Sequence, residues 1–447
     1  MAARYLYLEN AVVIDGSGAD PLERGAILVE GDRIAGVGTV DSLRPPAHEE
    51  VVVVDATGKT VMPGMIDCHF HCAYHSVTCW EDYDLRRPLE HTTILAARNA
   101  QTLLEVGFTS ARDVGSRGLV AVAVRDMINA GILIGPRMMA GSRIISSTGG
   151  LADGYGDWVD NRASLGQVVD GPSEVIKAVR QQVKYGVDNI KIEASGTGIS
   201  PYSASAKQTL TTEEMAAAVR EAHRNGVRVA CHAQATEGIK NAVRAGVDTI
   251  EHGSFLDEEG AELMSRAGTF LVPTISVFHL YVHRGPEVGV PQWVVDKFRG
   301  DLDAHMESVK LALDRGIPMA TGSDSGHSFN PQSMIAVELE LMVSAGFTPM
   351  QALQAATSVA ARAAGMADRV GRLQPGMYAD MLVVDGDPLA EIGILRQPER
   401  LERVYKGGLL LAGRLAPRRE ELEVGFELAP AQKARLEPSG APERPCC

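Results

Sequence analysis

Eight short apolar segments recur between residues 61 and 324, and stretches rich in Ala, Glu and Arg separate most of them. The segments read VMPGMIDCHFH, FTSARDV, PRMMAGSRII, DNIKIEAS, VRVACHA, DTIEHGS, TFLVPTI and IPMATGSD. Each has the length of a strand, and several follow a Gly that can cap a preceding helix. Eight repeats of strand and helix predict an α/β protein with a (β/α)8 barrel of the TIM type.

Two β-rich blocks flank these repeats, one from Leu6 to Val54 and one that begins near Gly371. A helical stretch from Thr348 to Gly365 precedes the second block. Neither block contains enough apolar strand for an independent core, so we expect both to build one composite β-sandwich. The predicted division is 1–58 and 370–415 for the sandwich, 59–369 for the barrel, and 416–447 for a polar C-terminal tail.

Composition excludes several classes of partner. The 447 residues carry a net charge of −14, and no cluster of Lys and Arg is long enough to neutralise a row of phosphates, so nucleic acid is not expected. No apolar run approaches the ~20 residues of a membrane span, and the first residues lack a secretion signal. Membrane partners are therefore not expected, and the predicted location is cytoplasmic. The six cysteines have no metal-finger spacing and are interpreted as free thiols.

Polar residues at strand ends are the candidates for catalysis and metal binding, because the active sites of such barrels lie at the carboxyl ends of the strands. The first segment ends in His69 and His71, which are two residues apart and so share one face of a strand. Asp67 shares that face and could support them. Taken alone, a His-x-His pair is more often a chance pair on a loop than a metal site. The other segments add single candidates: His232 ends the fifth, His252 the sixth and Asp324 the eighth.

Lys191 lies in the fourth segment between Ile190 and Ile192, and strand alternation directs its amine into the barrel mouth. A buried lysine needs a partner, a lowered pKa or a chemical modification. An ion pair with Glu193 or Asp113 would be the structural explanation. Four histidines, one lysine and one aspartate at the ends of five strands nevertheless favour a metal centre.

This constellation resembles the amidohydrolase superfamily, whose dinuclear members use a His-x-His pair, a carboxylated lysine, two further histidines and an aspartate. The flanking motifs VMPGMIDCHFH, TGSDSG and GRLQPGMYADMLVVDGDPL resemble that family as well. The motifs DNIKIEASGTG, CHAQATEGI, AGVDTIEHGS and TPMQALQAAT are similar to the imidazolonepropionase-like branch. That branch includes Xaa-Pro dipeptidases, carboxypeptidase-like enzymes for N-acyl amino acids, and amidases that hydrolyse ochratoxin A.

The resemblance implies a centre of two divalent metal ions, most simply zinc. His69, His71 and Asp324 would hold one ion, His232 and His252 the other, and a carboxylated Lys191 would bridge them. A metal-bound water would be the nucleophile, and Asp324 would accept its proton and return it to the leaving nitrogen.

The chain departs from the branch in its substrate loops. It reads STGGLADGYGDW where many relatives carry a His after Gly-Gly, and Gln234 replaces a second His after His232. Candidate substrate contacts are Asp153, Tyr155, Trp158, Phe278, Tyr281, Arg284, His327 and Asn330. The remaining histidines, His75, His91, His223, His279, His283 and His305, are expected at the surface or behind the ligands.

These observations predict a metal-dependent amide hydrolase that acts on a dipeptide or an N-acyl amino acid, with ochratoxin A as a test compound. Hydrolysis of a cyclic amide, or deamination, is the alternative enzyme activity, but relatives of that kind generally lack the bridging lysine. A third hypothesis is that the protein is a non-catalytic homologue that acts as a scaffold. Such a homologue would be expected to have lost metal ligands, whereas this chain keeps the whole set. Relatives often form homo-oligomers, so a homo-oligomer is expected here.

Overall fold

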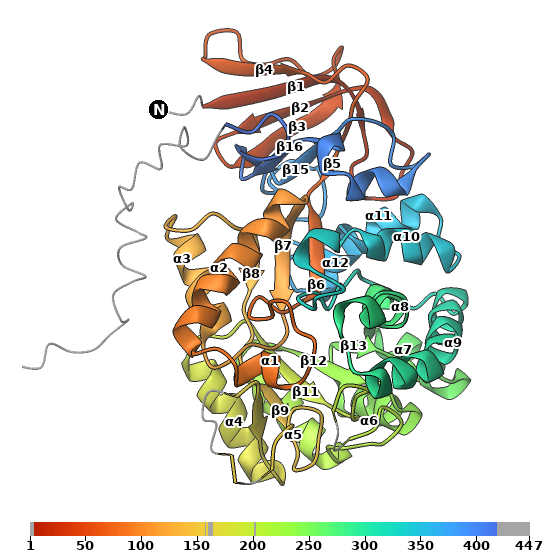
Figure 1. Cartoon of the computed structure of the whole chain (residues 1–447). Helices are drawn as coiled ribbons and strands as arrows, with labels where there is room; N and C mark the ends of the chain where they lie inside the picture. The colour runs from red at the N-terminus through yellow and green to blue at the C-terminus, as the bar shows by residue number, and fades with distance from the viewer. Residues whose placement is uncertain (1–3, 157, 160–163, 201–202, 418–447) are drawn as a thin grey trace, which may run out of the picture.

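The computed structural model describes residues 4–156, 158–159, 164–200 and 203–417. These residues form a mixed α/β fold (Figure 1), in which strands from the beginning and the end of the chain lie together at one end of the molecule. Parallel strands with helices around them make up the rest. The described strands are arranged in three sheets.

The largest sheet has eight strands in the order β17-β16-β15-β5-β1-β2-β3, with β4 paired to β1. Their bounds are β1 Tyr5–Val13, β2 Leu22–Glu30, β3 Arg33–Thr39, β4 Val51–Asp55, β5 Thr60–Pro63, β15 Met381–Val384, β16 Leu401–Lys406 and β17 Leu409–Ala412. Antiparallel pairing of β5 with β15 joins the two chain ends, and Leu8, Val61, Met381 and Tyr405 share one core cluster. The two β-rich blocks therefore build one sheet.

The parallel strands form a sheet of six, in the order β10-β9-β11-β12-β13-β14, and a sheet of three, β6-β7-β8. Their bounds are β6 Met65–Phe70, β7 Phe108–Asp113, β8 Arg137–Met139, β9 Ile144–Ser146, β10 Gly166–Val168, β11 Asn189–Glu193, β12 Arg228–Ala233, β13 Thr249–His252 and β14 Phe270–Val272. Every residue of β6, β7, β11 and β13 is buried, as expected for parallel strands covered on both faces.

The helices of the described residues alternate with these strands. They are α1 Glu81–Asp84, α2 Leu89–Glu105, α3 Val120–Asn129, α4 Pro172–Lys184, α5 Thr212–Arg224, α6 Thr236–Ala245, α7 Glu258–Ala267, α8 Ile275–His283, α9 Gln292–Asp314, α10 Val337–Ser344, α11 Pro349–Ala355 and α12 Ser358–Ala363. Short 3-10 helices cover Gly285–Val288, Gln332–Met334, Ile392–Arg396 and Pro398–Arg400. Local signals set their ends: Thr211 and Glu214 form a capping box at α5, and Gly246 ends α6 in a left-handed conformation. The single helical stretch expected over 348–365 is divided into α11 and α12.

Two of the eight expected barrel strands differ from the prediction. The third segment forms two short strands, β8 and β9, which belong to different sheets. Gly141 lies at this break and packs so closely that a Cβ would lie 2.6 Å from the Asp113 carbonyl oxygen, so the turn requires a residue without a side chain. The eighth segment forms only an isolated bridge, between Met319 and Leu271. Its backbone still contacts β6, since the Cys68 amide donates to the Thr321 carbonyl.

The eight-stranded sheet leads directly into the strand that carries the first two histidines. Only Gly64 separates β5 from β6, and a Cβ at Gly64 would lie 2.0 Å from Thr109 Oγ1. This close approach lets β6 pair with β7 immediately after the chain leaves the large sheet.

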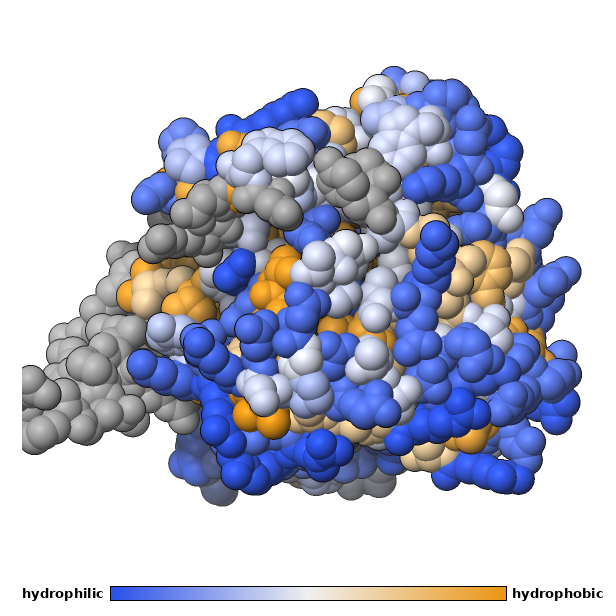
Figure 2. All heavy atoms as spheres, turned by 90° about the horizontal axis from the view of Figure 1, so that it is seen from below, coloured by the Kyte–Doolittle hydropathy of each residue, from blue (hydrophilic) through white to orange (hydrophobic). Residues whose placement is uncertain are grey.

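No helix within the described ranges is both long and apolar enough to span a bilayer. Figure 2 shows the face remote from the eight-stranded sheet, where hydrophilic side chains predominate and small hydrophobic patches lie between them.

Candidate metal centre

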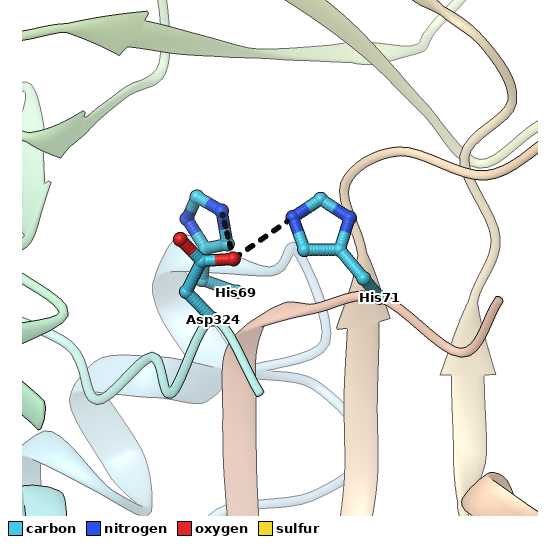
Figure 3. Close-up of side chains that lie close together, drawn as sticks. All are labelled: His69, His71 and Asp324. Carbon is cyan, nitrogen blue, oxygen red and sulfur yellow. Dashed lines mark ion pairs between the residues drawn. The ribbon is translucent and has the colours of Figure 1, made fainter. Parts of the chain in front are cut away.

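His69, His71 and Asp324 converge at the carboxyl end of β6 (Figure 3). Asp324 Oδ1 lies 3.3 Å from His71 Nε2 and 3.9 Å from His69 Nε2. The three ligand atoms lie within 4.8 Å of one another. Zinc is held by nitrogen and oxygen atoms about 2 Å away, so donors at these separations can bind one ion.

Both histidines of this group have a fixed ring orientation. His69 Nδ1 lies 2.7 Å from Glu251 Oε2, and His71 Nδ1 lies 2.7 Å from the Gly115 carbonyl oxygen. Because a carboxylate and a carbonyl only accept hydrogen bonds, each Nδ1 is the donor. Each Nε2 therefore keeps its lone pair, which is the arrangement that metal-ligating histidines need.

His232 and His252 extend this group across the neighbouring strands β12 and β13. His232 Nε2 donates to the Gly196 carbonyl at 2.9 Å, which leaves Nδ1 as its lone-pair atom. His252 Nδ1 lies 2.7 Å from Thr274 Oγ1. The His252 ring centroid is 4.6 Å from that of His232 and 4.9 Å from that of His69. The imidazoles thus form one continuous cluster.

Lys191 enters the same cavity from β11. Its side chain is buried, and Nζ has no hydrogen-bond partner. The ion pair considered from the sequence does not form, since Glu193 accepts from the Ser147 and Leu151 amides and Asp113 accepts from the Cys72 amide. Burial lowers the pKa of Lys191 to about 8. A buried amine without a hydrogen-bond partner fits a site where the amine contacts a bound ligand.

Glu251 connects the metal site to a buried arginine. Its Oε1 accepts a hydrogen bond from Arg112 Nη2 at 2.7 Å, and its Oε2 accepts from His69. Burial alone would raise the pKa of Glu251, but Arg112 and Lys191 outweigh it and hold that pKa below its usual range. The carboxylate is therefore ionised and orients the His69 ring.

Asp67 supports the metal site by accepting hydrogen bonds from the two segments that carry His69 and Asp324. Its Oδ1 accepts from the His69 and Ser323 amides at 3.0 and 3.1 Å, and its Oδ2 accepts from the Ser323 hydroxyl at 2.6 Å. One carboxyl group thus holds β6 against the segment that carries Asp324. Burial raises the pKa of Asp67 to about 7.

The backbone is strained where it presents these ligands. His252, Thr274 and Asp324 adopt φ angles of 70°, 51° and 47°, in the left-handed region that glycine favours. The Asp324 amide donates to the His69 carbonyl at 2.8 Å, which helps to hold this conformation. Strain of this kind is concentrated at functional sites.

All six candidate ligands line one cavity of about 50 Å³, and Tyr281, His327 and Phe278 contribute to its wall. The other expected substrate contacts, Asp153, Tyr155, Trp158, Arg284 and Asn330, do not line it. Their side chains have other surroundings: Tyr155 donates to Asp84, Arg284 Nη1 contacts Met334 Sδ, and Trp158 is 87% exposed. Asp153 accepts from the Gly149 amide, and Asn330 donates to the Ser323 carbonyl.

The loop after β6 forms an aromatic wall of the cavity that was not predicted from the sequence. Tyr74 stacks on His71 with ring centroids 4.1 Å apart, and Tyr83 donates to His327 Nε2 at 2.9 Å. Trp80 lines the same cavity. The available signal was the run AYHSVTCWEDYD, because it directly follows the first histidine pair. His305 is fully buried and stacks on Phe278, so it is not a surface residue.

Comparisons with known proteins agree with this geometry. Residues 60–411 match the model of the amidohydrolase family. The ochratoxinase of Aspergillus niger is 30% identical over 431 residues, which cover 92% of this chain and 87% of that protein. The crystal structure of a Xaa-Pro dipeptidase with methionine bound in its active site has a TM-score of 0.83 and 33% identity, over 92% of this chain and all of that one. An imidazolonepropionase of Ectopseudomonas mendocina (strain ymp) is 25% identical, over 87% of this chain and 94% of that protein.

Proposed function

Because this chain belongs to the amidohydrolase family and is a metal-dependent amide hydrolase, we propose that it releases a C-terminal amino acid from a dipeptide or an N-acyl amino acid. The ochratoxinase and the Xaa-Pro dipeptidase among its relatives support an amide of this kind. Lys191 lies in the cavity, and its presence favours this proposal over an imidazolonepropionase-like activity or deamination, because mononuclear relatives of that kind generally lack a bridging lysine.

One observation carries the proposal: six side chains of metal-binding type line one cavity, and they would supply enough donors for two divalent ions, with zinc as the expected metal. His69, His71 and Asp324 would hold the first ion, and His232 and His252 the second. Lys191, whose amine has no partner in the described residues, would bridge the two once it is carboxylated.

The environment of Lys191 suits that modification. A pKa of about 8 leaves on the order of a tenth of the amine neutral at pH 7. The neutral amine can attack carbon dioxide, so that an N–C bond forms, one C=O double bond opens to C–O⁻, and a proton leaves the nitrogen for solvent. The product is an anionic carbamate that offers two oxygen ligands.

The side chains then have separate tasks. When bound, the metal ions supply a Lewis acid for the substrate carbonyl and lower the pKa of a bound water. Burial would raise the pKa of Asp324, but His69 and His71 hold it well below its usual range, so this group is ionised. As the carboxylate beside the bound water, Asp324 is the proposed proton acceptor. Asp324 returns that proton to the leaving nitrogen, and Tyr281 and His327 contact the substrate from the cavity wall.

We also propose how the parallel strands close into a barrel and where the structural units begin and end. Closure of the parallel strands into a (β/α)8 barrel is supported by hydrogen bonds beyond the named sheets: Ala320 N donates to the Leu271 carbonyl, and Asp188 N donates to the Ala140 carbonyl. The unit boundaries remain part of the proposal: 1–58 and 370–415 for the composite β-sandwich, 59–369 for the barrel and 416–447 for the tail. Residues 418–447 lie outside the described part of the chain. The homo-oligomeric state and the cytoplasmic location stay predictions.

The decisive experiment is a screen of metal-loaded protein against dipeptides and N-acyl amino acids, ochratoxin A included, with released amino acid as the readout. Each active compound is compared with its carboxamide. We expect the free acid to be cleaved with a kcat/KM higher by tenfold or more, because a charged partner for the carboxylate contributes to transition-state binding. Equal cleavage of the carboxamide, or turnover of cyclic amides alone, would reject the proposal.

A further inference from the structure

A second cavity of about 300 Å³ adjoins the metal cavity. The two share four wall residues, Trp80, Tyr83, Ile199 and Tyr281. We call the cavity of the metal ligands the inner cavity and this second one the outer cavity. Only the outer cavity reaches the size range of ligand pockets, so the inner one has room for the reacting groups but not for a bulky substituent.

The wall of the outer cavity is apolar and aromatic. Besides the four shared residues, it is lined by Val77, Thr78, Cys79, Glu81, Pro291, Trp293 and Val294. Among these described residues there is no Lys, Arg or His, and the single charged group is the exposed carboxylate of Glu81. The lining offers a substrate carboxylate no cationic partner, and the nearby Lys297 ammonium lies over the Trp293 ring, whereas a neutral apolar group would gain contact area.

We propose that the outer cavity is the subsite for the acyl part of the substrate, and that it selects neutral, apolar groups of the size of one or two aromatic rings. The proposal rests on the function proposed above, since it places the carbonyl at the metal ligands and the released amino acid outside this subsite. Trp80, Tyr83 and Tyr281 stand at the passage between the cavities, so they contact the acyl group next to the scissile bond.

Close packing holds the aromatic side chains of Trp80 and Tyr281 in place at the passage. The indole of Trp80 lies so close to Gly154 that a Cβ there would be 1.6 Å from Trp80 Nε1. Tyr281 stacks on Phe298 with ring centroids 3.9 Å apart and parallel planes. Both aromatic walls are therefore held by close packing, which favours a flat ring over a branched chain.

The first test compares N-(2-naphthoyl)-phenylalanine with N-acetyl-phenylalanine on metal-loaded protein. Wild type should cleave the naphthoyl compound with a kcat/KM at least tenfold higher, and Trp293→Ala should lose most of this preference, mainly through KM. The matched control is Trp158→Ala, which removes an exposed tryptophan that lines neither cavity and should keep the preference. Equal rates for the two compounds in wild type, or an unchanged preference in Trp293→Ala, would overturn the proposal.

The second test does not depend on turnover. The chain has three tryptophans, so the variant Trp158→Phe retains only Trp80 and Trp293, both in the outer cavity. N-methyl-4-nitrobenzamide, a neutral aromatic quencher without a carboxylate, should quench their fluorescence saturably, and Trp293→Ala should weaken its binding. Quenching that never saturates would overturn the subsite even in an active enzyme. Saturable quenching without any turnover of N-acyl amino acids would instead retain the subsite and reject the proposed reaction.

Discussion

Glu251 and Arg112 hold the His69 ring from behind, and this buried pair is as important to the site as the ligand itself. Arg112 is 1% exposed and donates to Glu251, to Thr249 Oγ1 and to the Cys68 carbonyl. Its charge is compensated only as long as Glu251 stays ionised.

Glu251→Gln should therefore weaken both the fold and the metal site. Removal of the negative charge leaves Arg112 buried without a counter-ion, which costs about 3–5 kcal/mol of unfolding free energy. Metal affinity should fall about 10- to 100-fold, because His69 loses its charged acceptor. Chemical denaturation and metal titration measure the two effects. The control Glu259→Gln removes an exposed partner of Lys240 and should cost less than about 1 kcal/mol.

Lys191→Ala tests the bridge between the metal ions. Wild type should hold about two divalent ions per chain, and the variant should lose at least one, because His232 and His252 alone are too few ligands for the second ion. Elemental analysis of dialysed protein gives the count, and Lys177→Ala, which removes an exposed lysine, is the control. One ion in active wild type, with the same count in Lys191→Ala, would exclude the bridging role.

Asp324→Asn separates proton transfer from metal binding. The amide resembles the carboxylate in shape but cannot accept the proton, so turnover should fall by roughly 10²-fold or more while most of the metal stays bound. Steady-state kinetics and metal analysis on the same preparation measure both. Near-normal turnover at full metal content would assign the proton transfer to another group.

Individual site residues were predictable from the sequence where their position in a strand determines the direction of the side chain. Strand alternation and position at strand ends sufficed for His69, His71 and Lys191, whose placement in one cavity the structure describes. Arg112 was not predictable, because its role depends on a contact with Glu251 on a strand far along the chain. The aromatic wall of Trp80 and Tyr83 was missed because loop residues follow no periodic pattern.

At the scale of elements, helix α8 depends on a carboxyl group from α10. The N-cap residue Thr274 uses its Oγ1 for His252 and makes no side-chain cap for the helix. The amides of Ile275 and Ser276 instead donate to Glu338, at 2.9 and 2.7 Å. Glu338 thereby frees Thr274 to orient a candidate metal ligand, while α8 carries Tyr281 into the cavity wall.

Glu338 should make stability depend on pH. Burial raises its pKa to about 7 from an ordinary value of 4.5, so between these values the folded state binds up to one more proton than the unfolded state. Its contribution to stability is full below pH 4.5 and is lost as pH rises toward 7, by at most about 1.4 kcal/mol per pH unit. Glu338→Gln should flatten this decline in urea unfolding at pH 5, 6 and 7.

The control for that experiment is Glu340→Gln on the same helix, whose partner Arg396 is partly exposed. This variant should keep the wild-type dependence on pH. If Glu338→Gln keeps it as well, Glu338 does not take up the proton.

Some elements carry signals in their own residues. Ile190 and Ile192 alternate with polar residues in β11, and Thr211 with Glu214 has the spacing of a capping box at α5, so both follow from local residues. The third and eighth barrel segments were not predicted correctly. Their shape depends on the packing of Gly141 against Asp113, and of Gly322 against Val272 and His69, which are contacts between distant parts of the chain.

For the whole molecule, Arg137 joins the parallel strands to the eight-stranded sheet. From β8 it binds the buried carboxylate of Asp380 at 2.7 Å and stacks on Tyr378 at 3.6 Å. Asp380 also accepts from the Gly407 amide, between β16 and β17. This contact links the last strands of the chain to the strands that carry the metal site.

Arg137→Ala should destabilise the protein as a whole. It leaves the Asp380 carboxylate buried without its cation, which we expect to cost about 2–4 kcal/mol in chemical denaturation. The control Arg369→Ala removes a partly exposed arginine that pairs with the exposed Asp368, and it should cost less than about 1 kcal/mol. A loss for Arg137→Ala no larger than that of the control would show that this contact does not hold the two parts together.

The direct passage from β5 to β6 has a consequence for synthesis of the chain. On the ribosome, β5 should remain an open edge until β15, which follows all the parallel strands in the chain, emerges to pair with it. Only Gly64 lies between that edge and β6, which carries His69 and ends just before His71. Nascent chains that stall before Met381 should therefore carry all six candidate ligands and still fail to assemble the centre, so the protein should compete for metal only after β15 has been synthesised.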